Sequence, residues 1–572
     1  MNNIHIHTLD SLQTNLEKKE ENNPIFLIYQ FFIHKNKERH SEIQLALKKN
    51  VSNEFINKIY LLNERIYTDE ELGISSKKIK QILLNKRINF KNIFDFISGN
   101  NLNGYCITCN ADIFFDTSLK KLYKTGLHKE KKVFTQLRFD YTDEKLGKCA
   151  LFKSQLNFKN KNESVPQADS QDCWIFHSNF NIQKKYRKAF NFIFGKRGFD
   201  NKVTYLFYIL GYKVLNEPYL IKTYHVHKTQ IRDYSNKPED SVPGPYLQVG
   251  PKITGKIPIN NYPAPYLSLV NNKFKLRDFW NNTDGKYLDI DYGNKMMGLF
   301  LKNKIKNNEI FSIVLFNPII VKLCVFSLFL ENRTNLNERQ INHIGEKINN
   351  NLPLLKQQEG IGITDMDMYV KYCIKNLESF RDSDLGLVGY YLDPEWVKMR
   401  DEQSYIKKIL IDNKSKIITR EALQIYNYIH NSPWTHQLKK KRILIVAPFI
   451  DGIKERIHNN SIYGIDLFPE CEFIFIKSQH TFGNNPTRHF QVEFDTLTSQ
   501  IIPILADFDI ALIACNGLSN ILSHYLKKLK KSSIVVGNLL YIWFGCYTNN
   551  DFKDKGDILK LYMNKDWKKV TF

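Results

Sequence analysis

Short, nearly continuous apolar segments alternate with amphipathic segments between Arg442 and Asn538. The apolar segments read RILIVAPF (442–449), CEFIFIKS (471–478), DIALIAC (509–515) and SSIVVGN (532–538). The segments EFDTLTSQIIPILADF (493–508) and LSNILSHYLKKLK (518–530) place apolar residues at helical spacing. Strands that are apolar along their whole length are typical of a parallel sheet that helices cover on both faces. The pattern predicts an α/β fold whose ligands bind beyond the carboxyl ends of the strands.

A similar alternation begins near Pro24. Its strand candidates are PIFLIYQFF (24–32), KIYLLNE (58–64) and GYCITCNADIFFD (104–116), and its helix candidates are KERHSEIQLALKKN (37–50) and NKVTYLFYILGY (201–212). A Pro- and Gly-rich stretch, 241–266, then interrupts the alternation and predicts a boundary. We therefore expect two Rossmann-like α/β domains. The expected order is a leader (1–23), the first domain (24–235), a connector or partly structured middle region (236–345) and the second domain (346–572).

The chain is basic, with 82 Lys and Arg against 59 Asp and Glu and a net charge of +23. The Lys residues are spread along the chain among Asn and Ile, which is typical of solvated faces. We expect no specific nucleic-acid partner, because no helix-turn-helix, RRM or P-loop motif is present. A polyanion or anionic-membrane surface is the alternative, so peripheral membrane contact stays open.

The nine Cys residues are odd in number and lie mostly in apolar runs, which indicates reduced core residues and a cytoplasmic protein. If the chain is viral, this means the host cytoplasm or a virus factory. The polar N-terminus lacks the apolar core of a signal peptide. The run from Phe311 to Leu330 is apolar enough to consider as a membrane span, but Lys322 and Pro318 favour buried strands or helices.

Residues suited to metal-assisted chemistry recur in the first domain. Asp112 follows the strand candidate that begins at Gly104, and a carboxylate there can hold a divalent cation whose open positions bind diphosphate oxygens. Further carboxylates and a pair of imidazoles follow at Asp169, Asp172, His225 and His227. Asp112 taken alone is equally explained as a turn or capping residue, and the two His residues as polar strand residues.

The order of NADIFFD (110–116), FTQLRFDY (134–141), DSQDCWIF (169–176), GKRGFDN (195–201) and IKTYHVH (221–227) resembles glycosyltransferases of the GT-A type, of a kind met in large DNA viruses and some bacteria. The resemblance covers about residues 24–230. It implies that Asp112 is the last acid of a DxD metal motif and that His225 or His227 is a late metal or phosphate ligand. Asp169 or Asp172 would lie near the acceptor as the catalytic carboxylate, and Asn110 would lie in the donor site in place of the first Asp.

A second carboxylate pair, Asp393 and Glu395, follows the apolar stretch LGLVGYYL (385–392). Carboxylates at i and i+2 can converge on one Mg²⁺ or Mn²⁺, although a helix cap followed by a first-turn acid is the alternative. From about 351 to 549 the chain resembles the GT-D glycosyltransferases, which carry a DxE motif. That resemblance implies a metal-binding Asp393 and a metal-binding and catalytic Glu395. It also implies a nucleotide-sugar pocket lined by Pro448, Asn516, Gly517, Gly537 and Asn538.

These patterns predict a bifunctional enzyme that depends on Mn²⁺ or Mg²⁺. Each domain would move a sugar from a nucleoside-diphosphate sugar, most simply a UDP-sugar, onto a glycan or glycoprotein acceptor in surface-glycan synthesis. One alternative is a glycan-binding scaffold in which one or both domains are inactive. The other is a basic nucleic-acid-binding protein, which would rest on charge alone.

Overall fold

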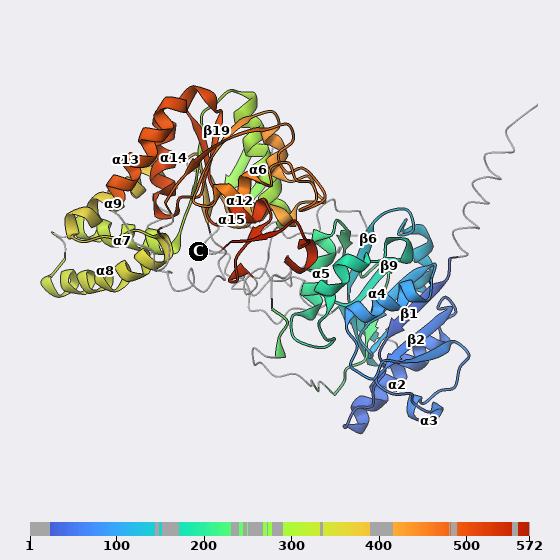
Figure 1. Cartoon of the computed structure of the whole chain (residues 1–572). Helices are drawn as coiled ribbons and strands as arrows, with labels where there is room; N and C mark the ends of the chain where they lie inside the picture. The colour runs from blue at the N-terminus through green and yellow to red at the C-terminus, as the bar shows by residue number, and fades with distance from the viewer. Residues whose placement is uncertain are drawn as a thin grey trace, which may run out of the picture. The chain divides into compact units, whose positions relative to one another are not determined.

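The computed structural model describes residues 23–143, 148–151, 171–229, 231, 240–243, 247, 249, 267–270, 273–276, 290–331, 334, 336–388, 416–479, 481, 489–551 and 559–570. The chain divides into two compact units, Met1–Pro263 and Ala264–Phe572, which are described separately (Figure 1). Both units are α/β, as the alternation of apolar and amphipathic segments predicts.

The first unit is built on a mixed sheet in the order β10-β6-β9-β4-β1-β2-β3. Its strands are β1 (Ile25–Tyr29), β2 (Lys58–Asn63), β3 (Ile79–Leu83), β4 (Tyr105–Cys109), β6 (Lys132–Leu137), β9 (Gln171–His177) and β10 (Lys213–Leu215). Only β9 runs antiparallel to its neighbours, β4 and β6. The strand predictions that begin at Pro24 and Lys58 are confirmed, whereas the single strand predicted for 104–116 is divided, because only its first part is β4 and residues 113–115 form a strand of another sheet.

A second, smaller sheet of the first unit has the order β5-β11-β7-β8. It contains β5 (Ile113–Phe115), β7 (Phe139–Asp143), β8 (Lys148–Leu151) and β11 (Thr223–His225). The chain passes from β4 of the large sheet to β5 of the small one through residues 110–112. Polar residues in this turn therefore lie where the two sheets meet.

Helices α2 (Lys37–Ser52), α4 (Phe90–Gly99) and α5 (Phe199–Ile209) accompany these sheets. The Asn36 side chain caps α2 by accepting from the backbone N–H of Arg39. Helix α2 therefore begins at Lys37, and Arg39 and Glu42, close to its start, are buried. Ile43 and Leu47 bury the apolar side of the helix in the core of this unit.

The second unit is built on a fully parallel sheet in the order β16-β15-β14-β20-β19-β17-β18. Its strands are β14 (Ser312–Leu315), β15 (Leu385–Val388), β16 (Lys416–Thr419), β17 (Arg442–Ala447), β18 (Glu472–Lys477), β19 (Ile510–Ile513) and β20 (Ser532–Val535). The parallel sheet predicted for residues 442–538 is confirmed.

Helices cover both faces of this parallel sheet (Figure 1). One face carries α7 (Pro318–Glu331), α8 (Glu338–Glu359), α9 (Met366–Arg381), α13 (Phe490–Ile501) and α14 (Ser519–Lys528), whose apolar residues form one core with the inward side chains of the strands. On the other side lie α6 (Ile290–Lys306), α12 (Ile450–Lys454) and α15 (Leu539–Trp543). Apolar strands covered on both faces are what a parallel sheet requires.

The segment predicted as a connector contributes β14 to the middle of this sheet. The apolar run that starts at Phe311 divides at Asn317, whose Oδ1 accepts from the backbone N–H of Ile319 at 3.1 Å, and Pro318 is the first residue of α7. Strand β14 is buried along nearly its whole length and α7 is apolar on all of its sides, so neither shows the one-sided pattern that identifies an amphipathic element in a sequence. Of the helices described, none has the length and apolar character needed to cross a bilayer.

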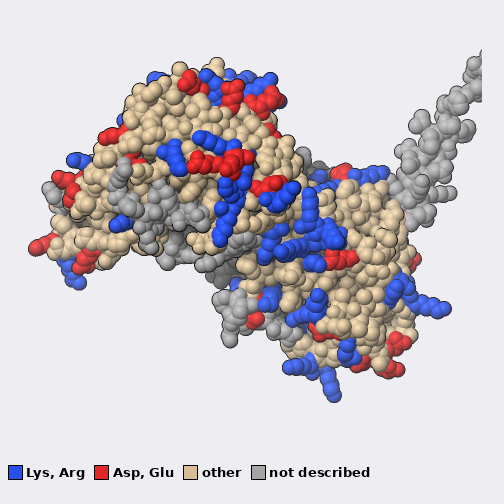
Figure 2. All heavy atoms as spheres, in the orientation of Figure 1, with Lys and Arg blue, Asp and Glu red and all other residues tan. Residues whose placement is uncertain are grey.

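Charged side chains on the visible surface are mixed in sign. Figure 2 shows Lys and Arg over both units with Asp and Glu among them. Several exposed Lys residues are paired locally, as Lys439 is with Glu470 at 2.6 Å and Lys477 with Asp451 at 2.7 Å.

Candidate functional site

Asp112 is held at the junction of the two sheets of the first unit. It precedes β5 directly, and β5 pairs with β11 so that Ile113 lies opposite His225. The backbone N–H of Val226 donates to the carbonyl of Asp112 at 2.9 Å. Strand pairing therefore brings two residues that are 113 positions apart into contact.

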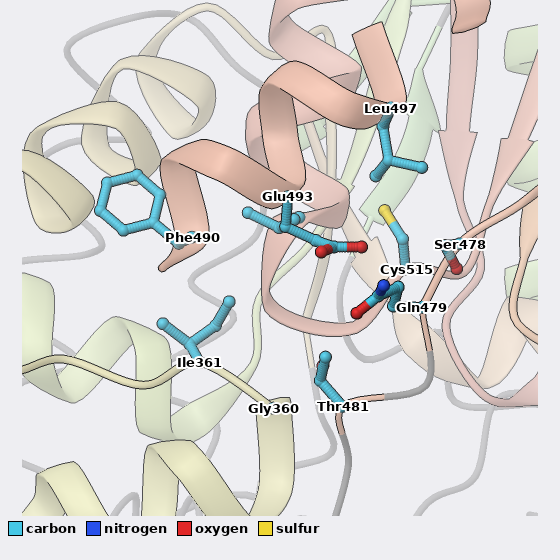
Figure 3. Close-up of a pocket in the computed structure, with 10 residues that line it drawn as sticks. Gly360, Ile361, Ser478, Gln479, Thr481, Phe490, Glu493, Leu497 and Cys515 are labelled. Atoms are coloured by element: carbon cyan, nitrogen blue, oxygen red, sulfur yellow. The ribbon is translucent and has the colours of Figure 1, made fainter. Parts of the chain in front are cut away.

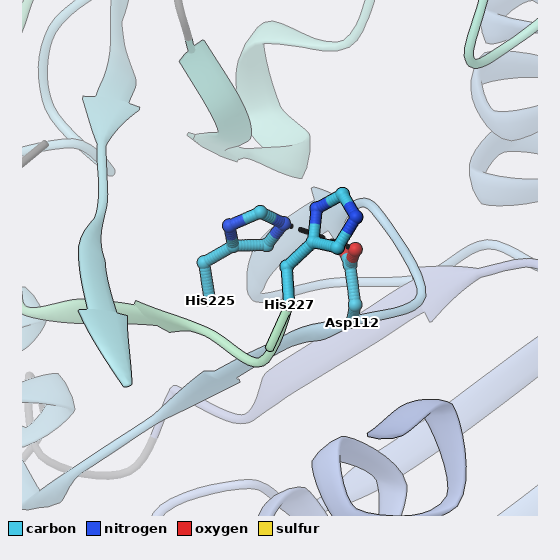
Figure 4. A group of neighbouring side chains, drawn as sticks. All are labelled: Asp112, His225 and His227. Carbon is cyan, nitrogen blue, oxygen red and sulfur yellow. Dashed lines mark hydrogen bonds and ion pairs between the residues drawn. The ribbon is translucent and has the colours of Figure 1, made fainter. Parts of the chain in front are cut away.

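Asp112, His225 and His227 form one cluster, which Figure 4 shows. His225 Nε2 lies 3.1 Å from Asp112 Oδ2, and one donor atom from each of the three residues lies within 4.8 Å of the others. Asp112 and His225 are only 5% and 8% exposed. The two imidazole rings are nearly perpendicular, with centroids 4.9 Å apart.

Arg39 supplies a buried positive charge to the cluster. Its guanidinium pairs with Asp112 Oδ2, donates to Glu42 Oε2 at 2.8 Å and donates to the carbonyl of Val226 at 3.0 Å. Glu42 in turn accepts from the backbone and hydroxyl of Thr229 at 2.8 and 3.0 Å. The first turn of α2 thus fixes both Asp112 and the chain that follows β11.

Arg138 lies on the other side of His225. Its Nε is 3.2 Å from His225 Nδ1, and its Nη1 pairs with Asp172 Oδ2. Asp172 Oδ1 accepts from Asn110 Nδ2 at 2.7 Å, and the Asp172 carbonyl accepts from the Asn110 backbone. The structure therefore brings Asn110, Asp112, Asp172, His225 and His227, all predicted from the sequence, into one connected network. Asp169 lies outside the described residues.

The charges of this network set the protonation of its members. Burial acts to raise the pKa of Asp112, but His225 and Arg39 outweigh it and hold that pKa well below its usual range. Burial acts to lower the pKa of His225, but Asp112 outweighs it and the pKa is raised. For His227, burial together with Arg39 lowers the pKa to about 4. His227 is therefore a neutral imidazole at pH 7, the form that binds metals.

The cluster fits a divalent cation. A carboxylate oxygen and two imidazole nitrogens suit first-row metals, and Asp112 Oδ1 is buried with no hydrogen-bond partner among the described residues. A buried polar atom without a partner lowers the stability of the folded state, so a cation bound at this oxygen would remove that cost. Three protein donors leave coordination positions for oxygens of a second molecule.

Two arginines of the network have no role in the sequence-based prediction. Arg39 belongs to α2, whose sequence shows only that the helix is amphipathic. Such a pattern does not distinguish a buried arginine from an exposed one. Arg138 lies within FTQLRFDY, between β6 and β7, where the chain passes from the large sheet to the small one. A basic residue between two strand segments was the available signal, because a buried arginine is almost always paired with an acid.

In the second unit the predicted pocket residues follow the strands at one edge of the sheet. Pro448 comes directly after β17, Asn516 and Gly517 come soon after β19, and Gly537 and Asn538 come after β20. In a parallel sheet these positions share the carboxyl edge, where ligands bind. Asp393 and Glu395 fall outside the part of the chain that the structure describes.

Comparisons with known proteins give partial likenesses only. No protein-family model matches the chain, and no curated protein matches it. A crystal structure of GalNAc-T7 with UDP, GalNAc and Mn²⁺ matches with a TM-score of 0.25 and 11% identity, over 39% of this chain and 53% of that one, so the chain spans about half the length of that protein. A 4-diphosphocytidyl-2C-methyl-D-erythritol synthase from Anaerococcus prevotii matches with a TM-score of 0.22 and 14% identity, over 38% and 94%. A second synthase of that name matches with a TM-score of 0.21 and 8% identity, over 38% and 95%.

Proposed function

We propose that the first unit is a metal-dependent glycosyltransferase domain that uses a nucleoside-diphosphate sugar. The observation that carries this proposal is the convergence of Asp112, His225 and His227 just beyond the carboxyl end of β4. A site at this edge of an α/β sheet, with a cation and open coordination positions, suits a diphosphate.

The residues of the network have distinct roles in this proposal. Asp112, His225 and His227 would hold the cation, which neutralises charge on the departing diphosphate. Arg39 and Arg138 keep two further positive charges beside the cluster, and they hold Asp112 and His225 in place. Asp172 is the carboxylate that we place at the acceptor hydroxyl, together with Asp169. To accept a proton, one Asp172 oxygen must exchange Arg138 or Asn110 for that hydroxyl.

For the second unit we propose a second glycosyltransferase domain, of the GT-D type, which would make the protein bifunctional. Asp393 and Glu395 would bind its metal, and the loops at Pro448, Gly517 and Asn538 would line its donor site. Support comes from the parallel sheet and from the shared carboxyl edge of these loops. We further propose UDP-sugars as donors and a glycan or glycoprotein hydroxyl as the acceptor.

The test is release of nucleoside diphosphate from a panel of UDP-, GDP- and dTDP-sugars with Mn²⁺ or Mg²⁺. Asp112→Ala and Asp393→Ala are compared with the wild type, and Asp116→Asn serves as a matched control four residues from Asp112. We expect metal-dependent release that Asp112→Ala abolishes for one donor and Asp116→Asn leaves intact. If Asp393→Ala alone abolishes release of another donor, the second domain is active.

Release that needs no metal, or that persists in Asp112→Ala, would contradict the role of the cluster. If no donor is cleaved and no donor raises the melting temperature, the scaffold alternative replaces this proposal.

A further inference from the structure

A pocket opens at the carboxyl edge of the parallel sheet of the second unit, between α13 and the ends of β18 and β19 (Figure 3). Its empty space is about 320 Å³ when the part that is open to solvent is counted, and its enclosed part has room for about one water molecule or one hydroxyl group. Ser478 and Gln479 follow β18, Cys515 follows β19, and Glu493 comes from α13. Apolar walls are provided by Ile361, Phe490, Leu497 and Leu518.

The pocket lies beside the point where the chain reverses its direction across the sheet. From β17 the chain crosses to β18 through α12 on one face, and from β18 it returns past β17 to β19 through α13 on the other face. In open parallel sheets, ligands bind beside such a reversal, at the carboxyl ends of the strands. The position alone therefore favours a ligand site.

Three buried polar atoms in and beside the pocket have no hydrogen-bond partner among the described residues. They are Glu493 Oε2, Ser478 Oγ and Asn516 Nδ2. Glu493 is 6% exposed and Ser478 is 5% exposed. Figure 3 shows the Glu493 carboxylate pointing into the pocket toward Gln479 and Cys515. Buried polar groups are rarely left without a partner, so these atoms require an oxygen that bonds to them, from a ligand or from an ordered water.

The chemistry of these groups selects the class of ligand. A carboxylate accepts hydrogen bonds only, an amide nitrogen donates only, and a hydroxyl does both. A phosphate would bring its negative charge against Glu493, which is unfavourable at a buried site. A single hydroxyl fits the enclosed space, where it can donate to Glu493 and accept from an amide nitrogen, while the group that carries the hydroxyl stays at the open side of the pocket.

We propose that a polyhydroxylated group, either the ribose of a nucleoside or a free sugar ring, binds at the open side of this pocket and that one of its hydroxyls enters and donates to Glu493. This site would give the second unit a place for part of its donor or acceptor. It rests on the proposed function only in treating that unit as an enzyme domain. It is independent of the metal cluster of the first unit.

The test is ligand-detected NMR titration of the full chain in EDTA, with uridine, 2′,3′-dideoxyuridine, glucose, galactose and inorganic phosphate as probes. We expect uridine or a hexose to bind, and Glu493→Gln to weaken that binding about tenfold, because a hydrogen bond to a charged acceptor is lost. Ser478→Ala should weaken it less and is too small a change to prevent folding. Asp495→Asn, exposed on the same helix, is the matched control.

The probes separate the two sources of hydroxyls. Binding of uridine but not of dideoxyuridine identifies the ribose, and binding of a hexose identifies the sugar ring. If neither uridine nor a hexose binds, if phosphate binds better, or if Glu493→Gln and Ser478→Ala both bind as the wild type does, the proposal is overturned. Failure of metal-dependent donor cleavage would overturn the proposed function and leave this result unchanged, because the titration contains no metal.

Discussion

His225 Nε2 and Asp112 Oδ2 lie 3.1 Å apart, although 113 positions separate the two residues in the chain. The contact is made by the pairing of β5 with β11 and is enclosed by Arg39 on one side and Arg138 on the other. A carboxylate and an imidazole in this arrangement stabilise each other's charged forms. The same atoms are the donors that a divalent cation would use.

Arg39 should oppose metal binding while it stabilises the fold. Arg39→Met leaves Asp112 and Glu42 buried without their cation, so we expect the free energy of unfolding to fall by about 3–5 kcal/mol. The same change removes a positive charge next to the cluster, so Mn²⁺ affinity should rise about tenfold or more. Denaturant unfolding and Mn²⁺ titration measure the two effects.

Arg65→Met is the matched control for Arg39→Met, because Arg65 pairs with Glu71 at the surface. It should change stability by less than about 1 kcal/mol and leave Mn²⁺ affinity unchanged. A loss of Mn²⁺ affinity in Arg39→Met would mean that Arg39 is needed to position Asp112 more than it repels the cation.

The amide of Asn110 should be required for stability, because it donates a hydrogen bond to the carboxylate of Asp172. Asn110→Asp places two carboxylates where Nδ2 now donates to Oδ1 at 2.7 Å, and we expect it to cost about 1–3 kcal/mol of stability. In the double variant Asn110→Asp/Asp172→Asn, an amide again faces a carboxylate. A double-mutant cycle should therefore give a favourable coupling of about 1 kcal/mol or more. Additive losses would show that the two side chains do not interact.

Glu359 should make the stability of the second unit depend on pH. Burial raises the pKa of Glu359 to about 8, although the hydrogen bond from Asn317 Nδ2 acts in the opposite direction. The folded state therefore holds a proton that the unfolded chain releases near pH 4.5. The stability that the protonated carboxyl contributes is fully present below about pH 4.5 and is lost as the pH rises to about 8, by up to about 5 kcal/mol.

The measurement is the free energy of unfolding from pH 5 to pH 9 for the wild type and Glu359→Gln, which keeps the hydrogen-bond acceptor and cannot titrate. We expect the difference between the two proteins to change in favour of Glu359→Gln as the pH rises. Parallel pH profiles would show that Glu359 titrates normally.

Gly517 should not tolerate a side chain. A Cβ at this position would lie 2.4 Å from Ile361 Cγ1 and 2.8 Å from the Tyr372 hydroxyl oxygen, so Gly517→Ala should destabilise the protein by about 1–3 kcal/mol. Gly345, inside α8, has no atom within 4 Å of its would-be Cβ. Gly345→Ala should therefore stabilise by about 0.5–1 kcal/mol. Melting temperatures that move in the same direction would refute this contrast.

The sequence predicted the elements whose patterns are one-sided or uniformly apolar. Strands β17, β19 and β20 were visible because parallel strands are apolar along their length. The buried strands or helices predicted for the run from Phe311 to Leu330 are confirmed as β14 and α7, but the uniformly apolar pattern did not show which part is strand and which is helix. The sequence places no visible boundary there except Asn317 and Pro318.

Of the candidate site, the sequence predicted the residues whose chemical type is unusual at a strand end. Asp112, His225 and His227 are of this kind. It did not predict Arg39, because the contact with Asp112 depends on how α2 packs against the small sheet. The pocket at Glu493 was also missed, because an acid within an amphipathic helix is usually exposed and only the packing of α13 buries it.

Direct Mn²⁺ binding tests the central claim, that Asp112, His225 and His227 hold a divalent cation. The measurement is titration followed by electron paramagnetic resonance, in a chain that carries Asp393→Ala so that the proposed second metal site does not contribute. We expect this chain to bind Mn²⁺, Asp112→Asn and His227→Ala to weaken binding by about tenfold or more, and Asp116→Asn to leave it unchanged. Equal Mn²⁺ affinity with and without Asp112→Asn would contradict the account.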